Sequence, residues 1–292
     1  MAREDFIKQI ECSKEFQILE RLGLHPDATA KDTVQQILDL AVAALDKEGP
    51  AELYGVGTID YNVSLALLEL AQRLGPAKHG KLVEFVSLLQ KEIVINPSTG
   101  EPLQTQGDVL FADLPSLGYT ELTTWYEFGG DYRGNPSDPK TKPKERERWV
   151  KLNAFIAQLS QAADIRYPPS GETFDMHCMD KSLHAIWTMQ FALEHEMHTP
   201  EALVDTAAME AACVWFIYAA DRLWANVQHS RMYDVSAGAG SNRFKERGWN
   251  GYTRERWELW HECLQDAKGA CTDERMGNLL EDALAHMRRA AS

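Results

Sequence analysis

Apolar residues along most of the chain recur at intervals of three and four positions, which is the period of an amphipathic helix. Four such runs occupy the N-terminal part, at about residues 3–22, 30–48, 60–74 and 79–94. Gly23 closes the first run, and the pairs Gly49-Pro50 and Gly75-Pro76 interrupt the chain between later ones. The pattern therefore predicts a helical array, and residues 1–94 could form a subdomain of it.

Residues 95–145 have a different composition. The stretches INPSTGEPLQTQGD and GGDYRGNPSDPKTKPKE concentrate Pro, Gly, Ser and Asp, and they flank the short piece TELTTWYEF. This loop-rich segment contains the plausible internal boundary of the chain. Its aromatic content favours a packed loop over a free linker, so we expect one domain spanning residues 1–292.

Helical periodicity returns from about residue 143, with runs at about 143–162 and 178–196. Thr199-Pro200 has the form of an N-cap followed by proline, and it precedes DTAAMEAACVWFIYAADRLW, which is apolar on nearly all sides. Such a helix should be central. Two more helices should begin near Thr253 and Thr272. Because no alternating strand pattern exceeds about four residues, we predict an all-α fold of roughly nine to eleven helices.

Charge and composition argue against several classes of partner and cellular location. A formal net charge of −14 argues against nucleic acids and anionic membrane surfaces as partners, since both require clustered Lys and Arg. The first sixteen residues carry scattered charges, and no apolar run approaches about eighteen residues, so neither a secretory signal nor membrane insertion is expected. The five cysteines form no CxxC pair, which favours reduced thiols and a cytoplasmic location.

The strongest metal candidate is the sequence EHEMH at residues 194–198. A helical zinc site of the protease type needs histidines at i and i+4, whereas these lie at i and i+3. Paired aspartate clusters of terpene cyclases and the Glu-x-x-His pairs of ferritin-like proteins are also missing from the sequence. We therefore expect no metal and no cofactor.

Aromatic and polar residues share faces on the predicted inner helices. His184, Trp187, Phe191 and Glu194 advance by three or four positions, while Trp257, Trp260 and His261 mark a later helix. Core packing is the ordinary explanation for such stripes, but convergent polar groups on apolar walls also form ligand pockets. Under the second interpretation, the catalytic candidates are His184, Asn153, Tyr218 and Glu194, and the substrate-binding candidates are Trp187, Phe191, Trp215, Trp125 and Trp257.

Five stretches resemble a fungal family known as domain of unknown function 3632. They are DVLFADLPSLGYTELTTWYE (108–127), ERWVKLNAFIAQLS (147–160), SLHAIWTMQFALE (182–194), AACVWFIYAADRLW (211–224) and YTRERWELW (252–260). The resemblance covers roughly residues 55–290 and rests on the spacing of aromatic and small residues. It implies a gene encoded beside a fungal natural-product pathway, as is often found for members of the family, and it carries over no catalytic residue.

Two functions follow as hypotheses. The first is a cofactor-independent cyclase or isomerase of secondary metabolism, such as a Diels-Alderase-like pericyclase performing a 4+2 cycloaddition on a small apolar natural-product intermediate. Trp187, Trp215 and Tyr218 would shape the substrate; His184, Asn153 or Tyr218 would donate a hydrogen bond, with Glu194 as acid or base. The alternative is a non-catalytic helical protein that binds a small molecule or assists another enzyme.

Overall fold

The computed structural model describes residues 3–47, 53–130, 134–168, 174 and 177–292. The chain forms two compact units, Met1–Gly130 and Asp131–Ser292, which we call the N-terminal and C-terminal units. The division falls inside the loop-rich segment of residues 95–145. The expectation of a single all-helical domain over residues 1–292 stays a prediction.

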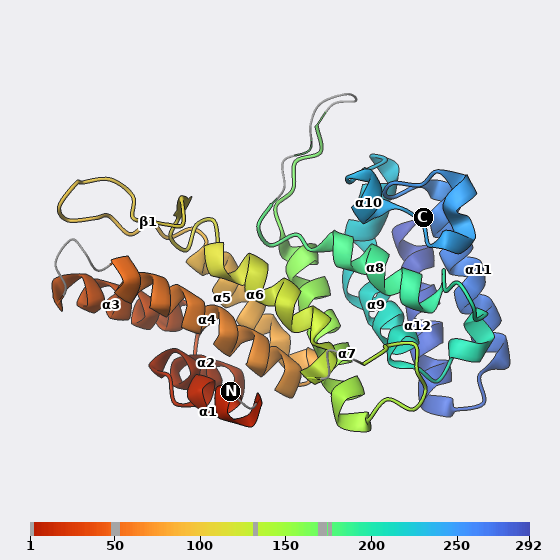
Figure 1. Cartoon of the computed structure of the whole chain (residues 1–292), viewed down its shortest axis with the longest axis horizontal. Helices are drawn as coiled ribbons and strands as arrows, with labels where there is room; N and C mark the ends of the chain where they lie inside the picture. The colour runs from red at the N-terminus through yellow and green to blue at the C-terminus, as the bar shows by residue number, and fades with distance from the viewer. Residues whose placement is uncertain (1–2, 48–52, 131–133, 169–173, 175–176) are drawn as a thin grey trace. The chain divides into compact units, whose positions relative to one another are not determined.

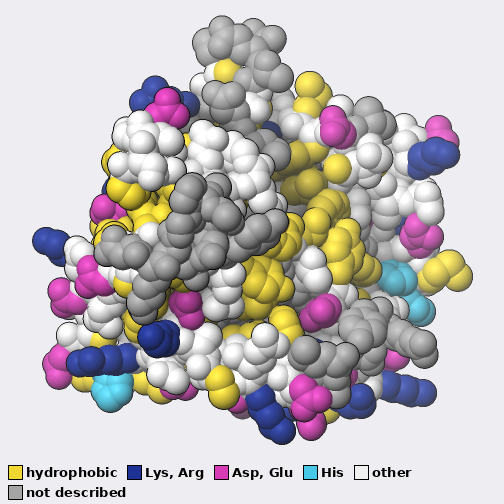
Figure 2. Space-filling model, turned by 60° about the vertical axis from the view of Figure 1, so that its left-hand side comes forward, with side chains coloured by type: hydrophobic (Ala, Val, Ile, Leu, Met, Phe, Trp, Pro, Cys, Tyr) yellow, Lys and Arg dark blue, Asp and Glu magenta, His cyan; other side chains and the backbone are white. Residues whose placement is uncertain are grey.

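The all-α prediction is confirmed. Across the described parts of the chain, eleven helices have seven or more residues. The strands β1 (Gln104–Thr105) and β2 (Asp108–Val109) have two residues each and pair antiparallel as a short hairpin. None of the helices in the described part is long and apolar enough to cross a membrane. Acidic and basic side chains are interspersed over the face seen in Figure 2 rather than gathered into separate patches.

The N-terminal unit is built around α4 (Leu53–Arg73), which packs against four other helices of the unit. These are α1 (Arg3–Glu11), α2 (Lys14–Leu24), α3 (Ala30–Lys47) and α6 (Pro115–Tyr126), accompanied by η1 (Pro76–Lys78), α5 (His79–Leu89) and η2 (Phe128–Gly130). Asp60 of α4 accepts a 3.0 Å hydrogen bond from the backbone N–H of Ser116. This bond satisfies one of the free amides at the start of α6 and ties that helix to α4.

The C-terminal unit surrounds α9 (Ala207–Gln228), the helix whose sequence is apolar on nearly all sides (Figure 1). Four helices pack against it: α7 (Pro143–Ala162), α8 (Ser182–Ala192), α11 (Arg254–Ala270) and α12 (Glu274–Ala290). The short elements η3 (Pro200–Leu203), α10 (Val235–Gly238) and η4 (Asn242–Arg247) lie in the connections. The predicted central position of α9 is confirmed.

Several predicted helix ends differ from the observed ones. The helix expected over 178–196 is shorter, because α8 ends at Ala192 and Glu194 already lies in the turn beyond it. Thr199-Pro200 begins only the short η3. The long helix α9 begins after Thr206, whose hydroxyl accepts from the Met209 N–H and serves as the N-cap. Thr253 caps α11 as expected, whereas Asp273 rather than Thr272 caps α12.

The connection between α9 and α11 folds back on itself. Backbone bridges join Met232 to Gly251 and Ala239 to Asn250, so two stretches of main chain run against each other. An added β-carbon at Gly238 would overlap the backbone of Asn250, and one at Gly251 would overlap that of Arg231. Glycine is therefore required at both positions for the main chain to approach this closely.

Candidate functional site

The predicted candidate Asn153 lies in the core of the C-terminal unit and connects three helices. Its Nδ2 donates to the Trp149 carbonyl at 2.9 Å, and its Oδ1 accepts from Trp215 Nε1 at 3.0 Å and from Thr188 Oγ1 at 3.1 Å. The structure thus brings the candidates Asn153 and Trp215 together, on α7 and α9. Since buried polar groups must be hydrogen-bonded, this arrangement explains both residues as parts of a packed core.

The candidate His184 is buried on α8, with its ring centroid 4.9 Å from that of Trp187. Burial, helped by the charge of Lys181, lowers the pKa of His184 to about 3. The imidazole is therefore neutral at physiological pH. Trp187 Nε1 donates to the Ala237 carbonyl at 2.9 Å, which fixes this indole against the segment after α9. Phe191 lies half-buried near the end of the same helix.

The candidate Glu194 is fully buried and forms a bidentate ion pair with Arg256 of α11. Arg256 Nε donates to Oε1 at 2.6 Å and Nη2 donates to Oε2 at 2.9 Å, while Trp260 Nε1 also donates to Oε1 at 2.7 Å. The remaining guanidinium N–H groups donate to the carbonyls of Gly238, Gly251 and Ala239. All five donors of a guanidinium are thus used. This carboxylate anchors the connection between α9 and α11.

Two further candidates, Tyr218 and Trp125, belong to different units of the chain. Tyr218 is half-buried on α9, and burial raises the pKa of its hydroxyl above the ordinary value. Trp125 belongs to the N-terminal unit, where it is buried on α6 with its ring edge-on to Tyr126. The other candidates all belong to the C-terminal unit.

The EHEMH segment forms a turn after α8 rather than a helical ligand pair. The rings of His195 and His198 lie 4.9 Å apart, and His195 Nδ1 accepts from the backbone N–H groups of Met197 and His198 at 3.1 and 3.2 Å. Glu196 accepts from Asn242 Nδ2 at 2.6 Å. Within the described residues, no group of three or more His, Cys, Asp or Glu side chains could hold a metal ion.

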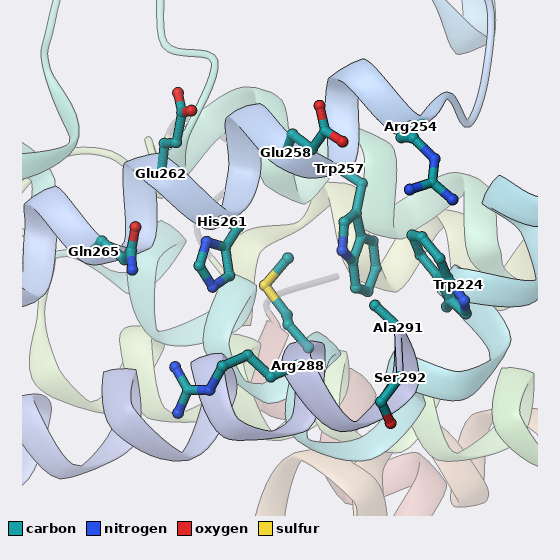
Figure 3. A pocket seen from close by; sticks show the side chains of 11 residues that line it. Trp224, Arg254, Trp257, Glu258, His261, Glu262, Gln265, Arg288, Ala291 and Ser292 are labelled. Atoms are coloured by element: carbon teal, nitrogen blue, oxygen red, sulfur yellow. The ribbon is translucent and has the colours of Figure 1, made fainter.

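A groove of about 470 Å³ lies between α11, α12 and the C-terminal end of α9. This volume falls within the range of about 300–1,000 Å³ that is typical of small-molecule sites. Figure 3 shows α11 and α12 on its two sides, with His261 and Trp257 directed from α11 toward α12. The lining residues are Trp224, Arg254, Trp257, Glu258, His261, Glu262, Gln265, Met287, Arg288, Ala291 and Ser292.

The floor of the groove is aromatic and firmly packed. The ring centroids of Trp224 and Trp257 lie 5.2 Å apart, and Phe216 packs edge-on against Trp257 at 5.5 Å. Trp224 is 8% exposed and Trp257 is 4% exposed, so only a small part of each indole is open to the groove. Of the residues predicted to bind substrate, Trp257 is the one that lines this groove.

Charged and titratable side chains form the rim. The guanidinium of Arg254 lies over the ring of Trp224, with its central carbon 5.3 Å from the ring centroid. Burial and the nearby positive charge of Arg288 lower the pKa of His261, although Glu262 opposes this. Arg288 itself donates to Glu281 at 3.2 Å in an exposed ion pair. The groove thus combines a neutral imidazole with two arginines.

Sequence reasoning identified Trp257 and noted His261, but it did not find the groove. Trp257 and His261 are four positions apart on α11, so their shared face was a usable signal. Trp224 and Arg288 come from α9 and α12, and their proximity to α11 depends on tertiary packing that no local spacing reports.

A second polar cluster, also missed from the sequence, gathers around Arg222 and Asn226, at the same C-terminal end of α9. Arg231 forms a buried ion pair with Asp180. Tyr167 donates from its hydroxyl to Asn226 Oδ1 at 2.9 Å and accepts from Arg222 at 3.2 Å. The residues at 169–173 and 175–176, next in sequence to this cluster, lie outside the described part of the chain. The contacts indicate a network that fixes the chain preceding α8 to α9.

Comparison with known proteins identifies a family. The sequence model described as "Protein of unknown function (DUF3632)" matches residues 65–264, which is more than half of the chain. The matched range begins in the second half of α4 and extends into α11, so it spans parts of both units. No curated protein and no solved structure shows significant similarity to the chain.

Proposed function

We propose that this chain, which belongs to the DUF3632 family, is a small-molecule-binding protein whose ligand occupies the groove between α9, α11 and α12. The observation that carries the proposal is a groove of ligand size in which an aromatic floor meets a polar rim. Ligand sites combine apolar walls with a few placed polar groups in this way.

The groove is a better candidate than the interior of α7, α8 and α9. Asn153 and Glu194 direct their polar atoms to neighbouring protein groups, and the side chains around them pack as a core. Opening that interior for a ligand would leave Trp215 or Arg256 without these partners, at a cost of about 1–3 kcal/mol for each buried group. A ligand can enter the groove without breaking any of these bonds.

Binding can be tested with isosteric naphthalene probes measured by isothermal titration calorimetry. We use 2-naphthoate, 2-naphthamide and 2-naphthylmethylammonium, because a flat bicyclic ring fits the volume of the groove. We expect at least one probe to bind the intact chain. The variant His261→Trp places an indole in the centre of the groove and should weaken binding about tenfold or more.

The matched control is Asp266→Trp, which adds the same indole to an exposed position of α11 that does not line the groove. This control should bind like the unchanged chain. Binding that survives His261→Trp, or the lack of binding by all three probes, would contradict the proposal.

A second proposal keeps the cyclase or isomerase activity expected from the sequence, now located in the groove. The observation favouring it is His261, whose pKa is lowered by burial and by Arg288, so that a neutral imidazole lies beside an aromatic floor. Such a group can accept a proton from a bound substrate. Conversion of an apolar biosynthetic intermediate that survives EDTA and is lost in His261→Gln, with binding retained, would support catalysis; conversion unchanged in that variant would refute it.

A further inference from the structure

We infer that the ligand of the groove is a flat, largely apolar molecule carrying one carboxylate, which binds Arg288 on the α12 side of the groove. This inference rests on the proposed function, since it specifies the ligand class of the same groove.

The two arginines reach the groove from different helices. Arg254 stands in the first turn of α11 and Arg288 in the last turns of α12, and Figure 3 shows their guanidinium groups toward opposite ends of the groove. Glu281 accepts one hydrogen bond from Arg288, while a guanidinium carries five N–H donors. A ligand carboxylate can therefore bind Arg288 without displacing Glu281.

The two acidic residues of the groove are turned away from its centre. In Figure 3, Glu258 and Glu262 extend from the side of α11 that is remote from α12, whereas His261 and Trp257 extend toward α12. The carboxylates therefore border the groove, and the imidazole and indole face into it. The anionic group of a ligand bound on the α12 side would therefore lie closer to the N–H donors of Arg288 than to these carboxylates.

The aromatic floor is not arranged to bind a cation. The face of Trp224 is already covered by the guanidinium of Arg254 at 5.3 Å, which occupies the position that a cationic ligand would take. The positive charge of Arg288 also disfavours a proton on His261, and it would disfavour a ligand ammonium in the same way.

The net charge of −14 does not overrule this local arrangement. At physiological ionic strength, charges more than about 8 Å apart on the surface are largely screened from each other. The groups within the groove therefore decide which ligand charge is favoured, and on the α12 side that group is Arg288, since the two acidic residues point away from α12.

The three naphthalene probes also test this inference, because they differ mainly in the charge of one substituent. We expect 2-naphthoate to bind about tenfold tighter than 2-naphthamide, which is the scale of one charge-assisted hydrogen bond, and the ammonium probe to bind most weakly. The substitution Arg288→Gln should reduce the preference for carboxylate over amide.

Arg289→Gln is the matched control, since Arg289 is the exposed neighbour of Arg288 on α12, pairs with Asp221 and does not line the groove. It should leave the preference unchanged. Equal affinities for carboxylate and amide, both lost in His261→Trp, would overturn the charge inference and leave the proposed function standing. If no probe binds, the proposed function fails and this inference fails with it. A carboxylate preference that Arg289→Gln reduces as much as Arg288→Gln would also overturn the inference.

Discussion

Arg254 and Arg256 lie two positions apart on α11 and have opposite surroundings. Arg256 is fully buried, pairs with Glu194 and donates three further hydrogen bonds to backbone carbonyls. Arg254 lies at the edge of the groove, over the ring of Trp224. Residues two positions apart project from opposite sides of a helix, so one side of α11 completes the core and the other side lines the groove.

The side chains around Arg254 and Arg256 are similar in type but differ in their hydrogen-bond partners. Both regions contain an arginine, a glutamate and tryptophan side chains, so residue type alone does not distinguish a structural ion pair from a binding surface. What distinguishes them is whether each polar atom has a protein partner. The interior around Glu194 should therefore govern stability, and the groove should govern ligand binding.

The largest expected effect comes from breaking the buried ion pair. The substitution Arg256→Met leaves the carboxylate of Glu194 buried without its charge partner, and we expect the free energy of unfolding to fall by about 3–5 kcal/mol. Urea unfolding followed by circular dichroism measures this. The matched variant Arg254→Met should change it by no more than about 0.5 kcal/mol. Similar losses for the two variants would remove the distinction between the two sides of α11.

The next effect concerns the hydrogen bonds that Asn153 makes to α8 and α9. In Asn153→Leu, the indole N–H of Trp215 loses its acceptor inside the core, and we expect a loss of about 1–3 kcal/mol. Thr188→Val should cost less, because it leaves the bond between Asn153 and Trp215 in place. Urea unfolding of both variants tests the order, and a larger loss for Thr188→Val would contradict the central position of Asn153.

A smaller effect should appear as a pH dependence. His184 has a pKa of about 3 in the folded chain and an ordinary value of 6.5, so only the unfolded chain binds its proton between these values. Stability should therefore fall as the pH drops below 6.5, by about 2 kcal/mol at about pH 5. His184→Leu should flatten the dependence of unfolding free energy on pH. An unchanged slope in this variant would assign the effect to other groups.

The smallest effect should be confined to the groove. Burial and the charge of Arg288 lower the pKa of His261, so Arg288→Gln should raise that pKa toward its ordinary value, and Glu262→Gln should lower it further. Titration of the histidine resonances by nuclear magnetic resonance separates these opposite shifts. Because both residues are at the surface, stability should change by less than about 0.5 kcal/mol in either variant. Shifts in the same direction would contradict the proposed position of Arg288 at the groove.

Much of the fold follows from local sequence signals. The helical run that begins near residue 143 and the helix start near Thr253 rest on interactions within one helix turn, and each is found in the structure. The predicted end of α8 was wrong because its last positions continue the helical pattern while Glu194 turns toward Arg256, a contact 62 positions away in sequence. A local pattern does not report such a tertiary contact.

The candidate site was less predictable for the same reason. The spacing of His184, Trp187, Phe191 and Glu194 suggested one shared face, but it did not show that Asn153 and Glu194 find partners in the protein. Trp224 and Trp257 lie 5.2 Å apart although they belong to different helices, and nothing in either helix indicates the other. Only the packing of α9 against α11 forms the floor of the groove.

The close crossing of main chain near Gly238 and Gly251 bears on how members of the family diverge. A side chain at either position would overlap backbone atoms, so substitution of a neighbouring side chain cannot relieve the clash. Relatives that share this crossing should have glycine at both positions, together with an arginine corresponding to Arg256, which donates to the carbonyls of both glycines. Relatives that lack all three should build this connection by another path. The residues at these three positions would therefore sort the family's sequences into two groups, according to how the chain returns from α9 to α11.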